Sequence, residues 1–135
     1  MTTNLIKTVL VVDDDAFQHQ IINDALRDEN YKIISMLNGE STLTWLLRKR
    51  PDLILMDINM PDYNGMEILQ KIKSYKHLVG VPIIMITSNQ SRGMVIESMQ
   101  KGAVNYIVKP FTRHLLVEKV RAALVSHEQI IDKDE

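Results

Sequence analysis

Runs of apolar residues recur along the chain, and they are rich in the β-branched side chains that favour strands. The first, third and fourth runs are almost continuous in apolar residues, which is typical of parallel strands buried on both faces. The runs predict strands at residues 9–12, 31–36, 53–56, 83–86 and 104–108.

Between these runs, the apolar residues take the spacing of amphipathic helices. Strands that alternate with helices imply right-handed crossovers and a parallel sheet covered by helices on both sides. The sequence therefore predicts a three-layer, doubly wound α/β domain. The predicted apolar stripes of the first, second, third and last helices are Phe17, Ile21, Ile22, Ala25 and Leu26; Leu43, Leu46 and Leu47; Met66, Leu69 and Ile72; and Leu115, Leu116, Val120 and Leu124.

The predicted fourth helix differs from the others because its apolar residues, Met94, Val95, Ile96 and Met99, cover more than one face. We expect at least one of them, Val95, to be exposed near Arg92, which would suit the docking of a partner protein. The alternative is that all four side chains belong to the core.

The chain has 135 residues, of which 45% are hydrophobic, so it fits one globular domain with a substantial core. We assign residues 8–125 to this domain, residues 1–7 to an N-terminal extension and residues 126–135 to a polar, unstructured C-terminal tail. Lysine and arginine total 16 against 17 aspartate and glutamate residues, which excludes a broad electrostatic attraction to nucleic acid or to an acidic membrane.

The chain contains no cysteine, which excludes disulfides and thiolate metal sites and agrees with a reducing compartment. No stretch is apolar enough for a signal peptide or for a membrane-spanning helix. We therefore expect a cytoplasmic protein without a membrane partner.

Polar residues of distinct chemistry stand at four of the predicted strand ends. Asp13–Asp15 follow the first strand, Asp57 the third, Thr87 the fourth and Lys109 the fifth. The carboxyl ends of parallel strands meet at one edge of the sheet, where such folds bind their ligands. We expect these side chains to lie close together.

Neighbouring carboxylates repel one another unless a cation neutralises them. Mg²⁺ is the natural candidate, because it prefers oxygen ligands and keeps several of its waters. The absence of cysteine and histidine from these strand ends disfavours zinc. The alternative is that Asp13–Asp15 only cap a helix and that Asp57 only begins a turn.

Lys109 precedes Pro110, so its backbone is held extended, and the peptide bond between them is a candidate for the cis form. Its ammonium group and the Thr87 hydroxyl would then hold the oxygens of a phosphoryl group on Asp57. The alternative is a surface lysine beside a turn and a strand-end hydroxyl that bonds to the backbone.

Four segments together resemble the receiver domain of two-component response regulators: VVDDD at 11–15, LMDINMPDYNGME at 55–67, IIMITS at 83–88 and YIVKPF at 106–111. The resemblance is specific because all four motifs occur in the family's order at strand ends. It implies a flavodoxin-like (βα)5 fold with strand order 2-1-3-4-5, in which ligands bind between the first and third strands.

The resemblance also implies a function. The domain would accept a phosphoryl group from a sensor histidine kinase or a histidine phosphotransfer protein, with Mg²⁺ as cofactor. It would signal to a downstream effector through a changed surface near Tyr106, Val95 and Arg92. Beyond self-phosphorylation and autodephosphorylation, no enzymatic activity is implied. The implied roles are phosphoryl acceptor for Asp57, metal ligand for Asp14, metal partner directly or through water for Asp13, backbone carbonyl ligand for Asn59, phosphoryl contact for Lys109, switch hydroxyl for Thr87 and switch aromatic for Tyr106.

Residues 112–121 lack the dense ladder of Arg and Asp found in receivers that dimerise ahead of a DNA-binding domain. We therefore expect a monomer without direct nucleic-acid contact. Because no effector segment follows Glu135, we expect output through docking or onward phosphotransfer. The alternatives are a phosphorelay intermediate and the receiver fragment of a longer regulator.

Three other classes share parts of the pattern. A phosphohydrolase of the haloacid-dehalogenase type would need Thr or Val where Phe17 stands. A flavin binder would need a phosphate loop rich in Ser, Thr or Gly after the first strand. A receiver fold that serves only for interaction is disfavoured by the complete set of Asp14, Asp57, Thr87 and Lys109.

Overall fold

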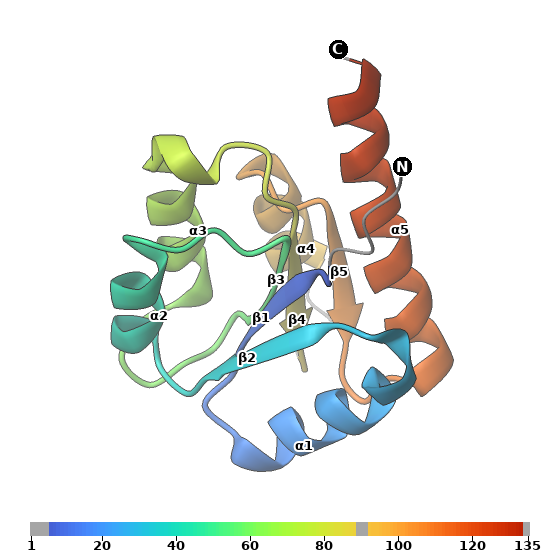
Figure 1. Cartoon of the computed structure of the whole chain (residues 1–135). Coiled ribbons are helices and arrows are strands. Elements are labelled where there is room, and N and C mark those ends of the chain that lie inside the picture. Colours follow the sequence, from blue (N-terminus) through green and yellow to red (C-terminus); the bar gives the residue numbers. More distant parts are fainter. Residues whose placement is uncertain (1–5, 89–91, 134–135) are drawn as a thin grey trace.

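The computed structural model describes residues 6–88 and 92–133, and for Arg92 and residues 126–133 it describes the backbone alone. A five-stranded parallel sheet in the order β2-β1-β3-β4-β5 forms the middle layer, with helices on both faces (Figure 1). The predicted architecture and strand order are confirmed. The elements are β1 (Thr8–Val12), α1 (Ala16–Ala25), η1 (Arg27–Glu29), β2 (Lys32–Met36), α2 (Gly39–Leu46), β3 (Leu53–Asp57), α3 (Gly65–Ser74), η2 (Lys76–Leu78), β4 (Ile83–Thr87), α4 (Arg92–Gln100), β5 (Asn105–Val108) and α5 (Arg113–Lys133), where η marks a short 3₁₀ helix.

The side chains of the sheet pack into two apolar clusters, one on each face, because successive residues of a strand point to opposite faces. Leu53 and Leu55 of β3 belong to the cluster formed with α1 and α5, whereas Ile54 and Met56 belong to the cluster formed with α2 and α3. Every residue of β3 and β4 is buried, which explains why their sequences show no polar alternation. Both strands are therefore packed on both of their faces as far as Asp57 and Thr87, the residues that end them.

The buried face of α1 differs from the predicted stripe. Ile22 and Ala25 are buried as expected, but Phe17 is 66% exposed and Ile21 is 37% exposed. The buried face includes His19, which precedes Ile22 by three residues, close to one helical turn. This phase turns Phe17 and Ile21 towards solvent.

Two further helix predictions need correction. Leu47 is 59% exposed because α2 ends one residue earlier, at the buried Leu46. The expectation of an unstructured tail is wrong as far as Lys133, because α5 continues to that residue without an intervening Gly or Pro. In the part of the chain that the structure describes, we find no membrane-spanning helix, since none combines the necessary length with enough apolar character.

The prediction that α4 exposes part of its apolar surface is confirmed, although not at the expected residue. Ile96 is 54% exposed and Met99 is 42% exposed, whereas Val95 is half-buried. The opposite side of the helix carries the fully buried Ser98, whose hydroxyl lies 3.4 Å from Met66 Sδ of α3. The contact with α3 therefore sets the phase of the helix.

Candidate functional site

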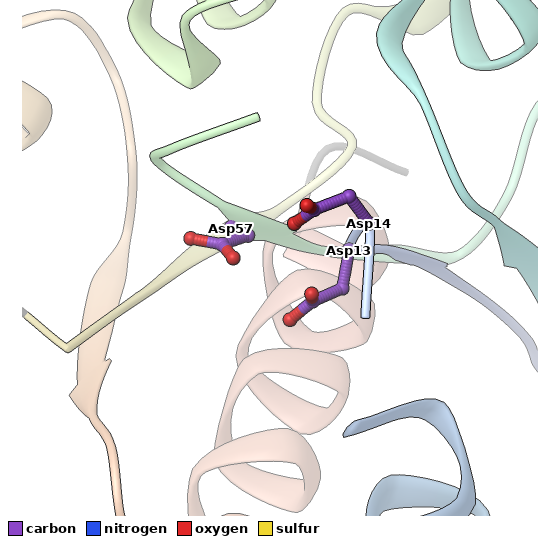
Figure 2. A group of neighbouring side chains, drawn as sticks. All are labelled: Asp13, Asp14 and Asp57. Carbon is purple, nitrogen blue, oxygen red and sulfur yellow. The ribbon is translucent and has the colours of Figure 1, made fainter. Parts of the chain in front are cut away.

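Two neighbouring strands end side by side and bring three aspartates together. β1 and β3 pair in register at Val12 and Met56, so Asp57, the last residue of β3, lies beside Asp13, which follows β1, and Asp14 comes next along the chain. One carboxylate oxygen from each aspartate lies within 4.8 Å of the other two. Figure 2 shows the three side chains gathered at these strand ends. The predicted acidic cluster at the carboxyl edge of the sheet is thus present.

Lys109 reaches this cluster from the loop that follows β5. Its Nζ donates to Asp13 Oδ2 at 2.8 Å and to Asp57 Oδ2 at 3.1 Å. Its backbone N–H donates to Thr87 O at 2.8 Å, and the Lys109–Pro110 peptide bond is cis. One ammonium group therefore pairs with two of the three aspartates.

Burial and charge act in opposite directions at Asp57, which is only 7% exposed. Burial is the main cause that raises its pKa above the ordinary value; the Asn59 N–H, at 3.1 Å, and the Lys109 ammonium lower it, and the Asp13 carboxylate raises it. Burial alone would lower the pKa of Lys109, but its contacts with Asp13 and Asp57 outweigh burial and raise it. The lysine therefore stays charged beside the cluster.

Asp13 and Asp14 differ in how firmly the protein holds them. The Asp13 carboxylate is buried and accepts the N–H of Asp15 at 2.9 Å in addition to its contact with Lys109. Asp14 is exposed, and among the described residues no hydrogen bond or ion pair reaches its carboxylate. Asp14 is thus available to a cation, whereas Asp13 is already bonded to the protein.

A glycine closes the loop that follows Asp57. Gly65 N donates to Ile58 O at 2.6 Å. A Cβ atom at Gly65 would lie 2.6 Å from Asp57 O and 2.7 Å from Ile58 Cα. No side chain fits there unless the backbone that carries Asp57 moves.

The same loop is joined to the start of α2. Asp62 accepts the backbone N–H of Gly39 at 2.9 Å and that of Glu40 at 3.0 Å. The bond from Gly39 is the main cause that lowers the pKa of Asp62. A Cβ atom at Gly39 would lie 2.5 Å from Tyr63 Cδ2, so the two elements pack closely as well. The start of α2 therefore supports the loop beside the acidic cluster.

Thr87 and Tyr106 project from the same face of the sheet. Tyr106 pairs in register with Met85, and Thr87 lies two residues beyond Met85 on β4. Thr87 is fully buried and Tyr106 is half-buried. Lys119 Nζ lies 5.0 Å from the centre of the Tyr106 ring and donates to Tyr106 O at 2.7 Å. The predicted switch residues thus occupy adjacent strands, and Lys119 contacts both the ring and the backbone oxygen of Tyr106.

The predicted partner surface is only partly accessible. Tyr106 and Val95 are half-buried, and the side chain of Arg92 lies outside the described residues. Greater exposure occurs at Ile96 of α4, at 54%, and at Val104 directly before β5, at 48%. The exposed apolar surface of this region therefore belongs mainly to residues that the prediction did not select.

Sequence reasoning missed His19, a residue of α1 that contacts the backbone of the acidic cluster at Asp13. It is 6% exposed, and its Nε2 lies 2.8 Å from Asp13 O and 3.1 Å from Met36 O. The sequence signal for this residue is its helical spacing to Ile22 and Ala25, which places it on the buried face of α1.

The donors of the cluster suit a hard divalent cation. Asp13, Asp14 and Asp57 offer carboxylate oxygens, the ligands that Mg²⁺ prefers, and no nitrogen or sulfur ligand joins them within the described ranges. A phosphohydrolase of the haloacid-dehalogenase type would use Asp13 as its nucleophile, but Asp13 is 2% exposed and paired with Lys109. Asp57 is 7% exposed and pairs with the same lysine, so burial and charge are alike at the two carboxylates.

The fold and the acidic edge are those of a known family. The family model for the response regulator receiver domain matches residues 9–121. The chain therefore belongs to the receiver domains of two-component signalling.

Curated relatives support this assignment. The DNA-binding response regulator MtrA of Mycobacterium tuberculosis (strain ATCC 25618 / H37Rv) is 36% identical over 116 residues, which cover 86% of this chain and 50% of MtrA. The phosphate regulon transcriptional regulatory protein PhoB of Pseudomonas aeruginosa is 34% identical over 118 residues, which cover 87% of this chain and 52% of PhoB. The chain thus spans about half the length of the curated relatives it matches.

Solved structures show the same fold. The chemotaxis response regulator CheY4 of Vibrio cholerae has a TM-score of 0.83 at 28% identity, and the match covers 89% of this chain and 100% of that one. A CheY-like receiver domain protein from Methanospirillum hungatei JF-1 has a TM-score of 0.84 at 30% identity, with 93% and 98% covered. The predicted flavodoxin-like receiver fold is confirmed.

Proposed function

We propose that this receiver domain accepts a phosphoryl group on Asp57 from the phosphohistidine of a sensor histidine kinase or of a histidine phosphotransfer protein. The observation that carries the proposal is the setting of Asp57 at the carboxyl edge of the sheet. Its carboxylate belongs to a cluster that suits a cation, and it lies 3.1 Å from Lys109 Nζ. Positive charge around an anionic nucleophile is what attack on a charged phosphoryl group needs.

In the proposed step, a carboxylate oxygen of Asp57 attacks phosphorus while the bond from phosphorus to the donor imidazole nitrogen breaks. The nitrogen keeps the electron pair of the broken bond, and an acyl phosphate forms on Asp57. Lys109 is our candidate for binding one phosphoryl oxygen, because its Nζ already contacts the Asp57 carboxylate. The Thr87 hydroxyl at the end of β4 is our candidate for a second oxygen.

Asp14 and Asp57 would hold Mg²⁺ together with the backbone carbonyl of Asn59, and Asp13 would take part directly or through a water molecule. When bound, the ion offsets the negative charge of the phosphoryl oxygens. Asp13 has a further task within the chain itself, since its 2.8 Å bond to Lys109 Nζ holds the ammonium beside Asp57.

We further propose that the acyl phosphate attracts the Thr87 hydroxyl and that Tyr106 then changes position. The two residues share one face of the sheet on adjacent strands. Val104, two residues before Tyr106, is 48% exposed, so a shift of β5 would alter an accessible apolar surface. A downstream effector would recognise that change. A stand-alone receiver and the receiver part of a longer regulator both agree with this function.

The direct test is to incubate the protein with magnesium and acetyl phosphate, a small phosphodonor, and to measure its mass. We expect the gain of one phosphoryl group, and hydroxylamine should remove it because hydroxylamine cleaves acyl phosphates. Chelation of magnesium should abolish the gain, and Asp57→Asn should show none.

Asp28→Asn serves as the matched control, because Asp28 is an exposed aspartate in η1, outside the acidic cluster. It should gain the phosphoryl group as the wild type does. No gain in the wild type, or an equal gain in Asp57→Asn, would contradict the proposal. A phosphohydrolase would instead turn over a stable phosphomonoester and would depend on Asp13.

A further inference from the structure

A buried histidine of α1 binds the backbone of the acidic cluster. Nε2 of His19 lies 2.8 Å from Asp13 O and 3.1 Å from Met36 O, and both oxygens can only accept, so Nε2 carries a hydrogen. Nδ1 is buried and has no hydrogen-bond partner within the described residues, so the polar contacts of the ring are those of Nε2. The geometry thus places a ring hydrogen on Nε2, which His19 donates to the backbone.

His19 closes a hydrogen-bonded triangle at the ends of β1 and β2. Met36 O also accepts the N–H of Asp13 at 3.1 Å, so β2 holds the Asp13 N–H while His19 holds the Asp13 C=O. The two carboxylate oxygens of Asp13 accept from Asp15 N and from Lys109 Nζ. Every polar group of Asp13 is therefore bonded.

Asp14 depends on this support, because it has none of its own. Its carboxylate is exposed and has no hydrogen bond or ion pair among the residues that are described. The peptide group that joins Asp13 to Asp14 contains the carbonyl that His19 binds. Rotation of that peptide would swing the Asp14 side chain relative to Asp57, and the bond from His19 opposes the rotation.

We infer that His19 is a positioning residue of the proposed Mg²⁺ site, which sets the direction of the Asp14 carboxylate through the peptide between Asp13 and Asp14. This inference rests on the proposed function, because Asp14 matters here as a metal ligand. Loss of a group that orients a metal ligand typically weakens metal binding about 10–100-fold.

The test compares His19→Leu with His19→Gln by calorimetric titration of the unphosphorylated protein with magnesium chloride. Leucine fills a similar space without a donor, whereas Nε2 of glutamine reaches a position close to that of the histidine Nε2 and can donate. We expect the dissociation constant for Mg²⁺ to rise about 10-fold or more in His19→Leu. In His19→Gln it should stay close to the wild-type value.

Ile22→Val is the structural control, since Ile22 lies on the same buried face of α1 and has no polar contact with the cluster. It should lower thermal stability and leave Mg²⁺ affinity unchanged. The inference fails if His19→Leu binds Mg²⁺ as tightly as the wild type, if His19→Gln loses as much affinity as His19→Leu, or if Ile22→Val loses affinity in proportion to its stability. In each of these cases the proposed function stands. A wild-type protein that binds no Mg²⁺ would instead overturn the proposed metal site, and with it the role of His19.

Discussion

Asp57 is 7% exposed, and its carboxylate lies beside the buried carboxylate of Asp13. Burial, the main cause, raises the pKa of Asp57, and the bonds from Asn59 and Lys109 do not cancel this effect. A carboxyl group with a higher pKa in the folded chain contributes stability below its ordinary pKa, and that contribution is lost as pH rises through the folded pKa. At neutral pH the ionised Asp57 therefore lowers the stability of the fold.

Asp57→Asn should consequently stabilise the protein at pH 7. We expect the free energy of unfolding to rise by about 0.5–2 kcal/mol, as is common when a strained functional group is removed. Urea unfolding measures this change. The difference from the wild type should shrink as pH falls towards about 3.9, the ordinary aspartate pKa, because Asp57 then becomes protonated in both states. A variant that is less stable than the wild type at pH 7 would contradict this account.

The small size of Gly65 matters for the backbone that carries Asp57. In Gly65→Ala, the new Cβ would meet Asp57 O at 2.6 Å, so the backbone must shift. We expect the free energy of unfolding to fall by about 1–3 kcal/mol and phosphorylation by acetyl phosphate to slow. Gly93→Ala in the exposed first turn of α4 is the control, and should add up to about 1 kcal/mol of stability without slowing phosphorylation. Equal rates in Gly65→Ala and the wild type would show that Asp57 tolerates the shift.

The clustered site residues could be predicted because their positions follow from strand ends alone. Asp13, Asp57 and Lys109 each end or follow an apolar run, and a parallel sheet brings such positions to one edge. His19 could not be predicted in this way. Its contacts with Asp13 O and Met36 O join three elements through backbone oxygens, which leave no mark on the sequence pattern.

Among the elements, the loop between β3 and α3 depends on α2 as well as on its own strand. Asp62 accepts the first N–H groups of α2, from Gly39 and Glu40, and these groups have no partner within the helix itself. Anything that loosens the start of α2 therefore also loosens the loop that begins at Ile58, directly after the proposed phosphoryl acceptor.

The variant Asp62→Ala tests the contact between this loop and the start of α2. We expect faster hydrogen exchange at the Gly39 and Glu40 amides, because their acceptor is lost, while amides in the middle of β3 stay protected. Asp62→Asn keeps one acceptor oxygen and should lie between Asp62→Ala and the wild type. The lowered pKa of Asp62 adds a pH test, since the wild-type protection should persist at neutral pH and fade only as pH falls below the ordinary aspartate range. Unchanged exchange in Asp62→Ala would argue against the support from α2.

The ends of the strands were easier to predict than which residues each helix buries. The continuous apolar runs placed β3 and β4 within one residue of their observed ends, because a strand buried on both faces needs no particular phase. A helix needs its phase, and the apolar Phe17 and Ile21 misled the prediction for α1 because the polar His19 takes a place on the buried face. The phase of α4 likewise depends on the contact between Ser98 and α3, which the sequence does not reveal.

In the whole molecule, the residues that form the core and the residues of the proposed site occupy different places on the sheet. The two apolar clusters lie on the two faces of the sheet, and the acidic cluster lies at its carboxyl edge, outside both. An ion held by all three aspartates would bind only the folded chain, because these residues come together only when β1 and β3 pair.

Magnesium should therefore raise the stability of the whole domain. At a free concentration about 100-fold above its dissociation constant, the expected gain in the free energy of unfolding is about 2.7 kcal/mol. Urea unfolding with and without magnesium, at constant ionic strength, measures this gain, and a chelator should remove it. Asp14→Asn should show a much smaller gain. An identical unfolding curve of the wild type in both conditions would contradict magnesium binding.

Lys109 acts as a tethered counterion at this edge. Its ammonium lies 2.8 Å from Asp13 and 3.1 Å from Asp57, so it already makes contacts that a free divalent ion would seek. An incoming ion would have to share those oxygens with the Lys109 ammonium, which is part of the chain and therefore always present. When the ion leaves, the ammonium still partly neutralises the carboxylates. We therefore expect loose and rapidly reversible ion exchange, which would let the domain follow changes in the supply of its phosphodonor without retaining the metal between signals.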